Sequence, residues 1–294
     1  MAESVVGVVG VGFMGSGIAE SVARTGVQVI AHEPDRAPLD RSRASIERSV
    51  GKAVRRGKLT EADGAELLER ITFTTSIDDL APADIVCEAI AENPHTKGTL
   101  FQKLDGIVGE DALLTTNTSS IPIAQIASWT RTPHRVLGLH YFSPVPVMKL
   151  VEVVRTLLTS DEAFDAAFEF ARGVGKEPIA CRDNSGFVVN RLLVPYLLDA
   201  VRAYEEGVGS IEDIDKGMQL GCGYPMGPFT LLDFVGLDTT ASIAEIMFDE
   251  YRERRFAAPP TLRKMVAAGW YGRKSGRGFY DYSGESPVAV DPGV

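Results

Sequence analysis

Hydrophobic residues in the first 182 positions follow two alternating patterns. Short apolar runs rich in Val and Ile are typical of buried strands, and they occur at residues 5–9, 27–31, 70–74, 84–90, 112–116, 136–140, 150–154 and 177–181. Segments with helical spacing lie between several of them, at 18–24, 94–104, 121–127 and 161–174. This alternation predicts an α/β domain, a doubly wound and mostly parallel sheet with helices on both faces.

Residues 35–69 interrupt this alternation with a predicted helical hairpin. Ile46, Val50 and Val54 recur every four residues, which gives the first helix a narrow apolar stripe. Gly57 is expected to end that helix. Thr60, followed three residues later by Asp63, is expected to cap the second.

Beyond residue 183 the β-branched runs stop and helical spacing takes over. The sequence predicts helices at 186–205, 211–219, 228–234, 238–251 and 261–268. We therefore expect a first domain over 1–183, an all-helical C-terminal domain over 184–283 and a flexible Gly- and Pro-containing tail over 284–294.

Composition excludes several classes of protein. The net charge of −10 argues against general nucleic-acid binding, and no apolar run is long enough to span a membrane. Cys87, Cys181 and Cys222 are far apart and odd in number, which predicts buried, reduced thiols and no metal site. The first predicted strand starts at Val5, which leaves no room for a targeting peptide. Together with reduced thiols, this early start predicts a cytoplasmic protein.

The first apolar run leads directly into Gly10-Val11-Gly12-Phe13-Met14-Gly15, a Gly-x-Gly-x-x-Gly motif. A strand before the motif and a helix after it are the context of a dinucleotide-binding turn in a Rossmann-like fold. Glu33 follows the second strand, 23 residues after Gly10, where an acid would bind the adenosine ribose. A glycine-rich turn of another α/β fold is the weaker alternative.

The predicted hairpin is strongly basic. Residues 36–58 contain eight Lys or Arg and two Asp or Glu, which gives 8 − 2 = +6 in a protein of net −10. Such a run is often only a solvated helix face. The contrast with the rest of the chain favours binding of a phosphate-bearing substrate.

Polar residues follow three of the predicted strands at their carboxyl ends, where open α/β sheets bind ligands. Asn117-Thr118-Ser119-Ser120 follows one strand, and Glu88, Glu92, Asn93 and Lys97 follow another. Of the four histidines, His140 alone ends a predicted strand, where it could act as a general base.

Glu152, in the next apolar strand, could orient His140, because a carboxylate there is costly unless it is paired. A structural histidine and a surface glutamate remain equally open alternatives. Asn190, early in the C-terminal domain, could bind a substrate carbonyl oxygen, but spacing alone favours a backbone cap.

Several segments resemble one known family along residues 5–282 in unbroken order. The resemblance is to the L-3-hydroxyacyl-CoA dehydrogenases, in their short single-function form of the 3-hydroxybutyryl-CoA dehydrogenase type. It rests on the glycine motif, residues 86–93, residues 117–121, the long stretch 138–153, residues 186–191, residues 224–229 and residues 272–280.

The resemblance implies roles for individual residues. His140 would be the general acid/base and Glu152 its partner, while Ser119 and Asn190 would contact the substrate oxygen. The implied cofactor contacts are Gly10, Gly12, Phe13, Met14, Gly15, Glu33, Glu92, Lys97, Asn117, Ser119 and Ser143. The hairpin would bind coenzyme A, with Arg41, Ser42 and Arg43 as candidates, and the helical domain would form a homodimer.

Two departures bear on the cofactor. Ser143 stands where asparagine is common, and Glu33 stands where aspartate is common. Either acid should repel a 2′-phosphate, which favours NAD over NADP, although His32 and Arg36 leave NADP open.

Three alternatives to the acyl-CoA reaction remain. One is the same chemistry on a carrier-protein substrate, and another is the family of free β-hydroxy-acid dehydrogenases, which usually rely on a lysine in the helical domain. The third is a non-catalytic, crystallin-like relative.

Overall fold

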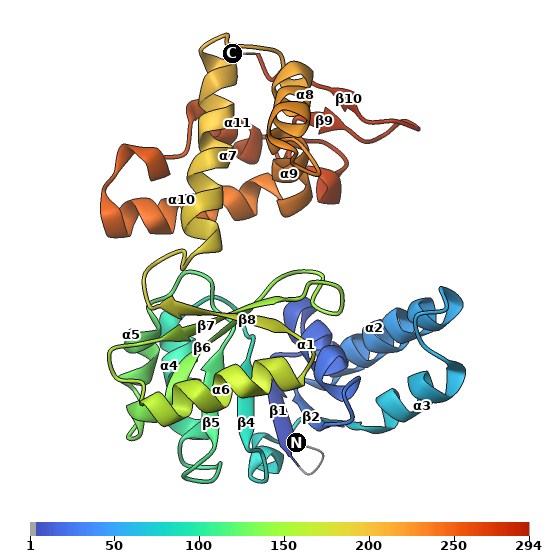
Figure 1. The fold of residues 1–294 in the computed structure, drawn as a ribbon, viewed down its shortest axis with the longest axis vertical. Coiled ribbons are helices and arrows are strands. Elements are labelled where there is room, and N and C mark those ends of the chain that lie inside the picture. Colours follow the sequence, from blue (N-terminus) through green and yellow to red (C-terminus); the bar gives the residue numbers. More distant parts are fainter. Residues whose placement is uncertain (1–3, 294) are drawn as a thin grey trace. The chain divides into compact units, whose positions relative to one another are not determined.

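The computed structural model describes residues 4–293. They divide between Phe187 and Val188 into two compact units (Figure 1). The first unit is built on a single sheet of eight strands in the order β3-β2-β1-β4-β5-β6-β7-β8. Their bounds are β1 (Val5–Val9), β2 (Gln28–His32), β3 (Ile71–Thr74), β4 (Ile85–Glu88), β5 (Leu113–Thr116), β6 (Val136–Tyr141), β7 (Leu150–Arg155) and β8 (Glu177–Arg182). All neighbours run parallel except β6 and β7, which confirms the predicted mostly parallel sheet.

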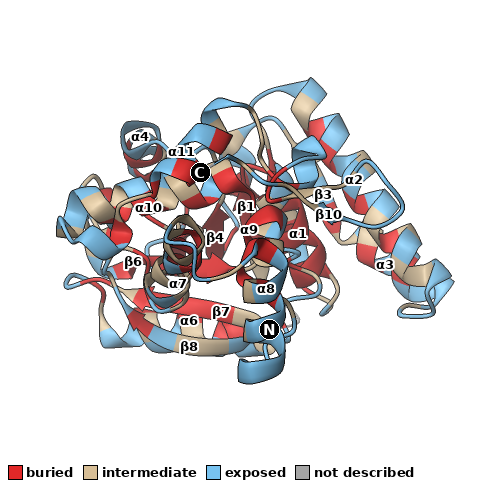
Figure 2. Cartoon of the chain, turned by 90° about the horizontal axis from the view of Figure 1, so that it is seen from above, coloured by how far each residue is buried: buried red, intermediate tan, exposed pale blue. Residues whose placement is uncertain are grey.

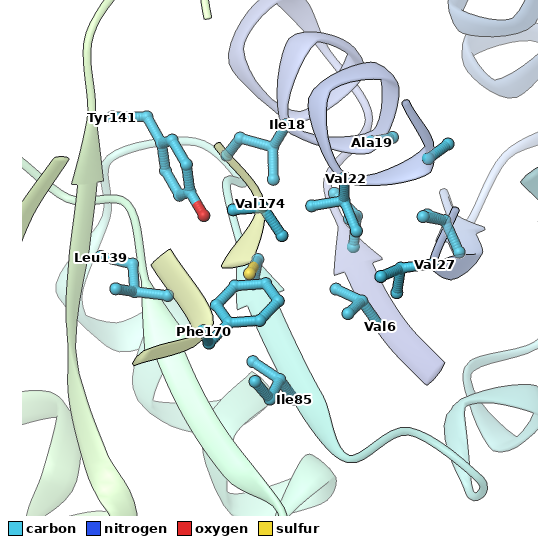
Figure 3. Packing of buried hydrophobic residues seen from close by; sticks show 14 of the residues in the cluster. Val6, Ile18, Ala19, Val22, Val27, Ile85, Leu139, Tyr141, Phe170 and Val174 are labelled. Atoms are coloured by element: carbon cyan, nitrogen blue, oxygen red, sulfur yellow. The ribbon is translucent and has the colours of Figure 1, made fainter. Parts of the chain in front are cut away.

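Helices cover both faces of this sheet (Figure 1). Apolar residues of α1 and α6 pack on one face, and those of α4 and α5 pack on the other. Figure 3 shows Ile18 and Val22 of α1 and Phe170 of α6 among the buried residues of the first face. The helices of this unit are α1 (Phe13–Ala23), α2 (Arg36–Arg55), α3 (Glu61–Glu69), α4 (Pro94–Leu104), α5 (Ile123–Ala127), α6 (Asp161–Gly173) and the short 3-10 turns η1 (Ile77–Leu80) and η2 (Pro133–Arg135).

The predicted hairpin is formed by α2 and α3, whose residues are mostly exposed or half-buried (Figure 2). Ile46 and Val50 are buried on the inner side of α2, as the four-residue spacing predicts. Gly57 follows the helix with φ +66°, a conformation that side chains with a Cβ rarely adopt. Thr60 and Asp63 form the predicted capping box at the start of α3.

The second unit packs five helices around its own apolar core. They are α7 (Val189–Glu205), α8 (Ile211–Cys222), α9 (Pro228–Val235), α10 (Leu237–Tyr251) and α11 (Pro260–Ala267), with the turns η3 (Arg254–Phe256) and η4 (Arg273–Ser275). Two buried carboxylates organise this unit. Asp215 accepts from the backbone N–H of Phe229 at 2.7 Å, and Asp233 accepts from that of Phe279 at 2.9 Å.

The structure corrects four expectations for the C-terminal part of the chain. The C-terminal unit is helical but also contains a two-stranded antiparallel sheet, β9 (Tyr280–Asp281) and β10 (Val288–Ala289). Part of the predicted flexible tail is therefore a strand, because its backbone pairs with the segment before it. The first helix starts at Val189 rather than at residue 186, and Cys222 is exposed rather than buried.

Candidate active site

The glycine motif forms a tight turn in which a side chain at Gly10 or Gly15 would clash with backbone. Gly10 has φ +84°, and a Cβ there would lie 2.7 Å from the backbone of Ala89 and Ile90. A Cβ on Gly15 would lie 2.0 Å from the carbonyl oxygen of Gly10. Apart from Gly12 and its chain neighbours, no heavy atom of the described residues lies within 4 Å of the Cβ position of Gly12, at the N-cap of α1, so this side of the turn is open. The turn thus presents free backbone N–H groups at a helix N-terminus, which suits a pyrophosphate.

A pocket of about 720 Å³ adjoins this turn. Its lining comes from the carboxyl ends of β1, β2 and β4 and from η1 and α4, and it includes Gly10, Gly12, His32, Glu33, Ile77, Ile90 and Lys103. Glu33 is half-buried, and burial raises the pKa of its carboxyl above 4.5, against a hydrogen bond from the backbone of Val11 that lowers it. The Phe13 side chain next to the turn is 80% exposed.

His140 and Glu152 are direct neighbours across β6 and β7 in the antiparallel register. His140 Nδ1 lies 2.7 Å from Glu152 Oε2, and both side chains are buried. The rings of Phe142 and Phe187 pack around His140, with centroids 4.7 and 5.5 Å from it. A neutral His140 that donates Nδ1–H to the carboxylate leaves Nε2 as a proton acceptor. The geometry supports the predicted pair, which spacing alone left open.

Asn117 joins the ends of two strands. Its side-chain oxygen accepts from the backbone N–H of Tyr141 at 2.8 Å, and its own backbone N–H donates to the carbonyl of Glu88. The Ser119 side chain, two residues further on, is half-buried, and its hydroxyl has no hydrogen-bond partner in the described part of the chain. Ser119 therefore keeps a hydroxyl available for a ligand.

Lys97 is 1% exposed and its ammonium is fully occupied by protein acceptors. Nζ lies 2.6 Å from Glu88 Oε1, 3.3 Å from Glu92 Oε2 and 3.4 Å from the carbonyl of Ile90. Glu88 also accepts from the hydroxyl of Thr116 at 2.7 Å. Three donors with three acceptors leave the ammonium no proton for a further contact.

Glu92 connects this buried group to the segment around Ser119. Its carboxylate accepts from the hydroxyls of Thr118 and Ser120, on either side of Ser119. Burial raises the pKa of Glu92, but the charge of Lys97 and these hydroxyls outweigh it and lower the pKa overall. The Lys97 network thus fixes the backbone that carries Ser119.

Comparison with known proteins identifies the family. A family model for the 3-hydroxyacyl-CoA dehydrogenase NAD-binding domain matches residues 5–184, and one for the C-terminal domain of the same enzymes matches residues 186–282. The chain belongs to the 3-hydroxyacyl-CoA dehydrogenase family. It is an NAD-binding oxidoreductase, as the sequence predicts.

Full-length relatives agree with this assignment. A 3-hydroxybutyryl-CoA dehydrogenase of Mycobacterium tuberculosis is 51% identical over 94% of this chain and 98% of its own length. The human mitochondrial hydroxyacyl-coenzyme A dehydrogenase is 45% identical over 94% of this chain and 90% of its own. The crystal structure of an (S)-3-hydroxybutyryl-CoA dehydrogenase from Ralstonia eutropha, 43% identical, covers 95% of this chain and 99% of its own with a TM-score of 0.91.

The predicted coenzyme A contacts of this 3-hydroxyacyl-CoA dehydrogenase lie on different sides of α2. Arg41 and Arg43 are exposed, and the Arg43 guanidinium lies 4.6 Å from the ring centroid of Phe73. Ser42 is buried on the inner side, and its hydroxyl donates to the carbonyl of Pro38 at 3.0 Å. The structure therefore does not bring Ser42 to the basic surface. The helical period, about 100° per residue, accounts for the difference.

Two further residues of the predicted site are Ser143 and Asn190. Ser143 is exposed in the connection between β6 and β7. Asn190 is the second residue of α7, is half-buried, and belongs to the C-terminal unit. Their contacts with ligands stay predictions.

Sequence reasoning named Thr118 and Ser120 only as part of a polar segment at a strand end, and it gave Asp183 no role in the site. The first two hold Glu92, and a cluster of hydroxyls opposite an acid is the signal that could have found them. Asp183 caps α5 by accepting from the backbone N–H of Ile123 at 2.9 Å and of Ala124 at 2.7 Å. Within residues 4–293, none of the helices has the length and apolar character needed to cross a membrane.

Proposed function

We propose that this 3-hydroxyacyl-CoA dehydrogenase interconverts a short (S)-3-hydroxyacyl-CoA, 3-hydroxybutyryl-CoA above all, and its 3-keto product, acetoacetyl-CoA. The substrate follows the names of the most similar relatives. The observation that supports the chemistry is the buried contact between His140 Nδ1 and Glu152 Oε2 at 2.7 Å. A buried histidine held by a carboxylate is suited to move one proton in each direction.

In the oxidation, His140 Nε2 accepts the proton of the substrate hydroxyl. Glu152 stabilises the imidazolium that results, because its negative charge lies against Nδ1. In the reduction, the same imidazolium returns the proton to the new alkoxide. NAD, when bound, supplies the hydride acceptor and NADH the hydride donor.

The residues of the glycine turn fit the dinucleotide. The open side of Gly12 and the N-terminus of α1 would hold the pyrophosphate, and Glu33 would accept from the adenosine ribose hydroxyls. Phe13, Met14 and Ser143 are further candidate contacts. Asn117, Glu92 and Lys97 would act by holding the backbone on which Ser119 stands, because their side chains already bind protein groups.

Ser119 and Asn190 are the candidate donors to the substrate's 3-oxygen. Both side chains carry a proton donor at neutral pH, and fixing the oxygen before reaction lowers the entropic part of the barrier. The exposed arginines of α2 would attract the phosphates of coenzyme A.

The test of this proposal is a spectrophotometric panel. Acetoacetyl-CoA and longer 3-ketoacyl-CoAs are offered with NADH and with NADPH, and kcat/KM is measured for each. We expect the highest kcat/KM for a short 3-ketoacyl-CoA with NADH. Turnover of none of them would overturn the proposal and leave a non-catalytic, crystallin-like role.

Neutralising the basic hairpin distinguishes a CoA thioester from a carrier-protein substrate. For R41Q/R43Q/R55Q, the KM for acetoacetyl-CoA should rise about tenfold, since three exposed charge contacts of about 0.5 kcal/mol each add to roughly 1.5 kcal/mol. The KM for acetoacetyl-pantetheine, which lacks the nucleotide, should stay unchanged.

The control is R172Q, on α6, where Arg172 is paired with Glu169 at an exposed site. R172Q should change neither the KM for acetoacetyl-CoA nor the KM for acetoacetyl-pantetheine. An unchanged KM for acetoacetyl-CoA in the triple variant would argue against nucleotide binding by the hairpin and favour a carrier-protein substrate.

Dimerisation through the helical unit and a cytoplasmic location also stay proposals. Leu192, Val208 and Leu220 of the helical unit are each more than 70% exposed, and such apolar residues often mark an interface. Light scattering on the purified protein would test the dimer, and a monomer at micromolar concentration would contradict it.

A further inference from the structure

Lys176 is a buried lysine that the proposed chemistry does not use. Its ammonium donates to the backbone carbonyl of Val145 at 2.6 Å and to that of Met148 at 3.0 Å. Both carbonyls belong to residues 142–149, which join β6 to β7 and are called the β6–β7 connection below. A charged side chain is costly to bury, so these two bonds compensate for the lost hydration of the ammonium.

The backbone of Lys176 is fixed on both sides. It follows the C-terminus of α6, where Gly175 has φ +74° and its N–H donates to the carbonyl of Arg172 at 2.9 Å. The N–H of Lys176 donates to the carbonyl of Ala171 at 3.0 Å, which completes a Schellman motif. The next residue starts β8, and its N–H donates to the carbonyl of Lys149 at 2.9 Å. The side chain of Lys176 therefore starts from a fixed point and is suited to hold a neighbouring segment.

The two bonds of the ammonium hold a turn within the β6–β7 connection. The N–H groups of Val147 and Met148 both donate to the carbonyl of Pro144 at 2.9 Å, which closes this turn. Lys176 binds the carbonyls of Val145, inside the turn, and of Met148, at its end. Hydrogen bonds from a charged donor are stronger than those between neutral groups. Loss of the ammonium would take this donor from both carbonyls and leave the turn less ordered.

The β6–β7 connection packs against the helix that begins at the glycine turn. A Cβ on Gly17 of α1 would lie 2.9 Å from Cβ of Val145 and 3.3 Å from Cδ of Pro146. Val145 is buried in the same apolar cluster as Ile18 of α1. Gly17 lies five residues after Gly12, the N-cap at which the pyrophosphate would bind. The connection therefore lies directly beside the helix on which the proposed cofactor site is built.

The β6–β7 connection also begins next to the proposed reaction centre. It follows β6, which carries His140, and the ring centroid of its first residue, Phe142, lies 4.7 Å from that of His140. Its second residue is Ser143, a candidate cofactor contact. The adenosine of NAD would lie at Glu33, after β2, and in the sheet order β2 and β6 lie on opposite sides of β1. The connection is therefore placed to meet the nicotinamide half of the cofactor rather than the adenosine half.

We propose that Lys176 is a positioning residue, which holds the β6–β7 connection in the conformation that binds the nicotinamide half of NAD. The proposal rests on the dehydrogenase site proposed above, with the nicotinamide beside His140. Lys176 acts through the backbone of the connection. If the connection occupied this conformation only part of the time, the apparent affinity for the cofactor would fall by the same fraction.

The test compares the binding of NADH with that of ADP, which carries the adenosine and both phosphates of the pyrophosphate but no nicotinamide nucleoside. The fluorescence of NADH gives its own dissociation constant, and displacement of NADH gives that of ADP. K176M removes the donor and keeps a long, unbranched side chain. K176M should raise the dissociation constant of NADH about tenfold and leave that of ADP within about twofold of the native value.

Two further variants distinguish positioning from a general effect on the fold. K176R keeps a charged donor and should bind NADH within about threefold of the native protein. K149M changes an exposed lysine of the same connection, paired with Glu177 at 3.2 Å, and should leave both dissociation constants unchanged. The proposal would be overturned by an equal rise for NADH and ADP in K176M, by unchanged binding of NADH, or by an equal loss in K176R and K176M.

K176Q covers the case in which K176M does not fold. Its amide remains polar, but its side chain is one bond shorter, so at least one of the two bonds to the connection should be lost. The dissociation constant of NADH should then rise about threefold or more while that of ADP stays unchanged. Equal changes for the two ligands would contradict a positioning role. These measurements need no acyl substrate, so a failure of the dehydrogenase proposal would show only in the turnover panel and would be distinguishable.

Discussion

H140Q is expected to lower kcat for acetoacetyl-CoA reduction by about 10²- to 10⁴-fold, the usual contribution of a positioned general acid. Glutamine fits the space between Phe142 and Phe187 and can still bond to Glu152, but it cannot release a proton. The affinity for NADH should stay within about twofold, since the side chain is not part of the glycine turn. Stopped-flow or steady-state absorbance of NADH measures kcat. Fluorescence titration measures the affinity for NADH.

Two further variants make this prediction specific. H134Q changes an exposed histidine in η2 and should leave kcat unchanged. E152Q keeps His140 but removes the negative charge next to its Nδ1 atom. The kcat of E152Q should therefore lie between those of the native protein and H140Q. Near-normal turnover by H140Q would refute the assigned role.

The sheet and the cofactor turn could be predicted because their signals are local. The apolar runs, the Gly10–Gly15 spacing and the position of Glu33 each depend on a few consecutive residues, and the resulting βαβ units follow general rules of handedness and order. The capping box at Thr60 is local in the same way. These elements needed no knowledge of distant contacts.

Contacts between distant segments limited the prediction of the site. The proximity of His140 and Glu152 requires the antiparallel register of β6 and β7, and a shift of one residue would turn Glu152 to the other face. Lys97 could be named as a candidate, but its closed network depends on Glu88, Glu92 and the carbonyl of Ile90 meeting at one point. The burial of Ser42 depends on which side of α2 faces the sheet.

The same argument applies to the C-terminal end. The segment 284–294 contains Gly and Pro and has no periodic spacing of apolar residues that would predict a strand. In the structure, however, Ala289 pairs with Tyr280, and the N–H of Val290 donates to the carbonyl of Phe279. Backbone pairing of this kind needs a partner strand rather than a sequence pattern. The exposure of Cys222 likewise follows from its place at the last turn of α8.

The Lys97 network yields the largest expected effect on stability. K97M should lower the free energy of unfolding of the NAD-binding unit by about 3–5 kcal/mol, because it leaves the carboxylate of Glu88 buried without its cation. Trp129 packs against Gly98 of α4, next to Lys97, so its fluorescence reports the unfolding of this unit. Urea denaturation in a W270F background, which removes the other tryptophan, measures the effect.

A double variant separates loss of charge balance from loss of packing. K97M/E88Q removes both charges, so part of the lost stability should return, and the double variant should unfold at higher urea than K97M alone. The control is K149M: Lys149 pairs with Glu177 at 3.2 Å at an exposed site, and its loss should cost no more than about 0.5 kcal/mol. A cost below about 1 kcal/mol for K97M, or no recovery in the double variant, would contradict a charge-balanced buried network. Glu92 of the same network binds Thr118 and Ser120, which lie on either side of Ser119. K97M should therefore also lower kcat in the absence of urea, whereas K149M should leave kcat unchanged.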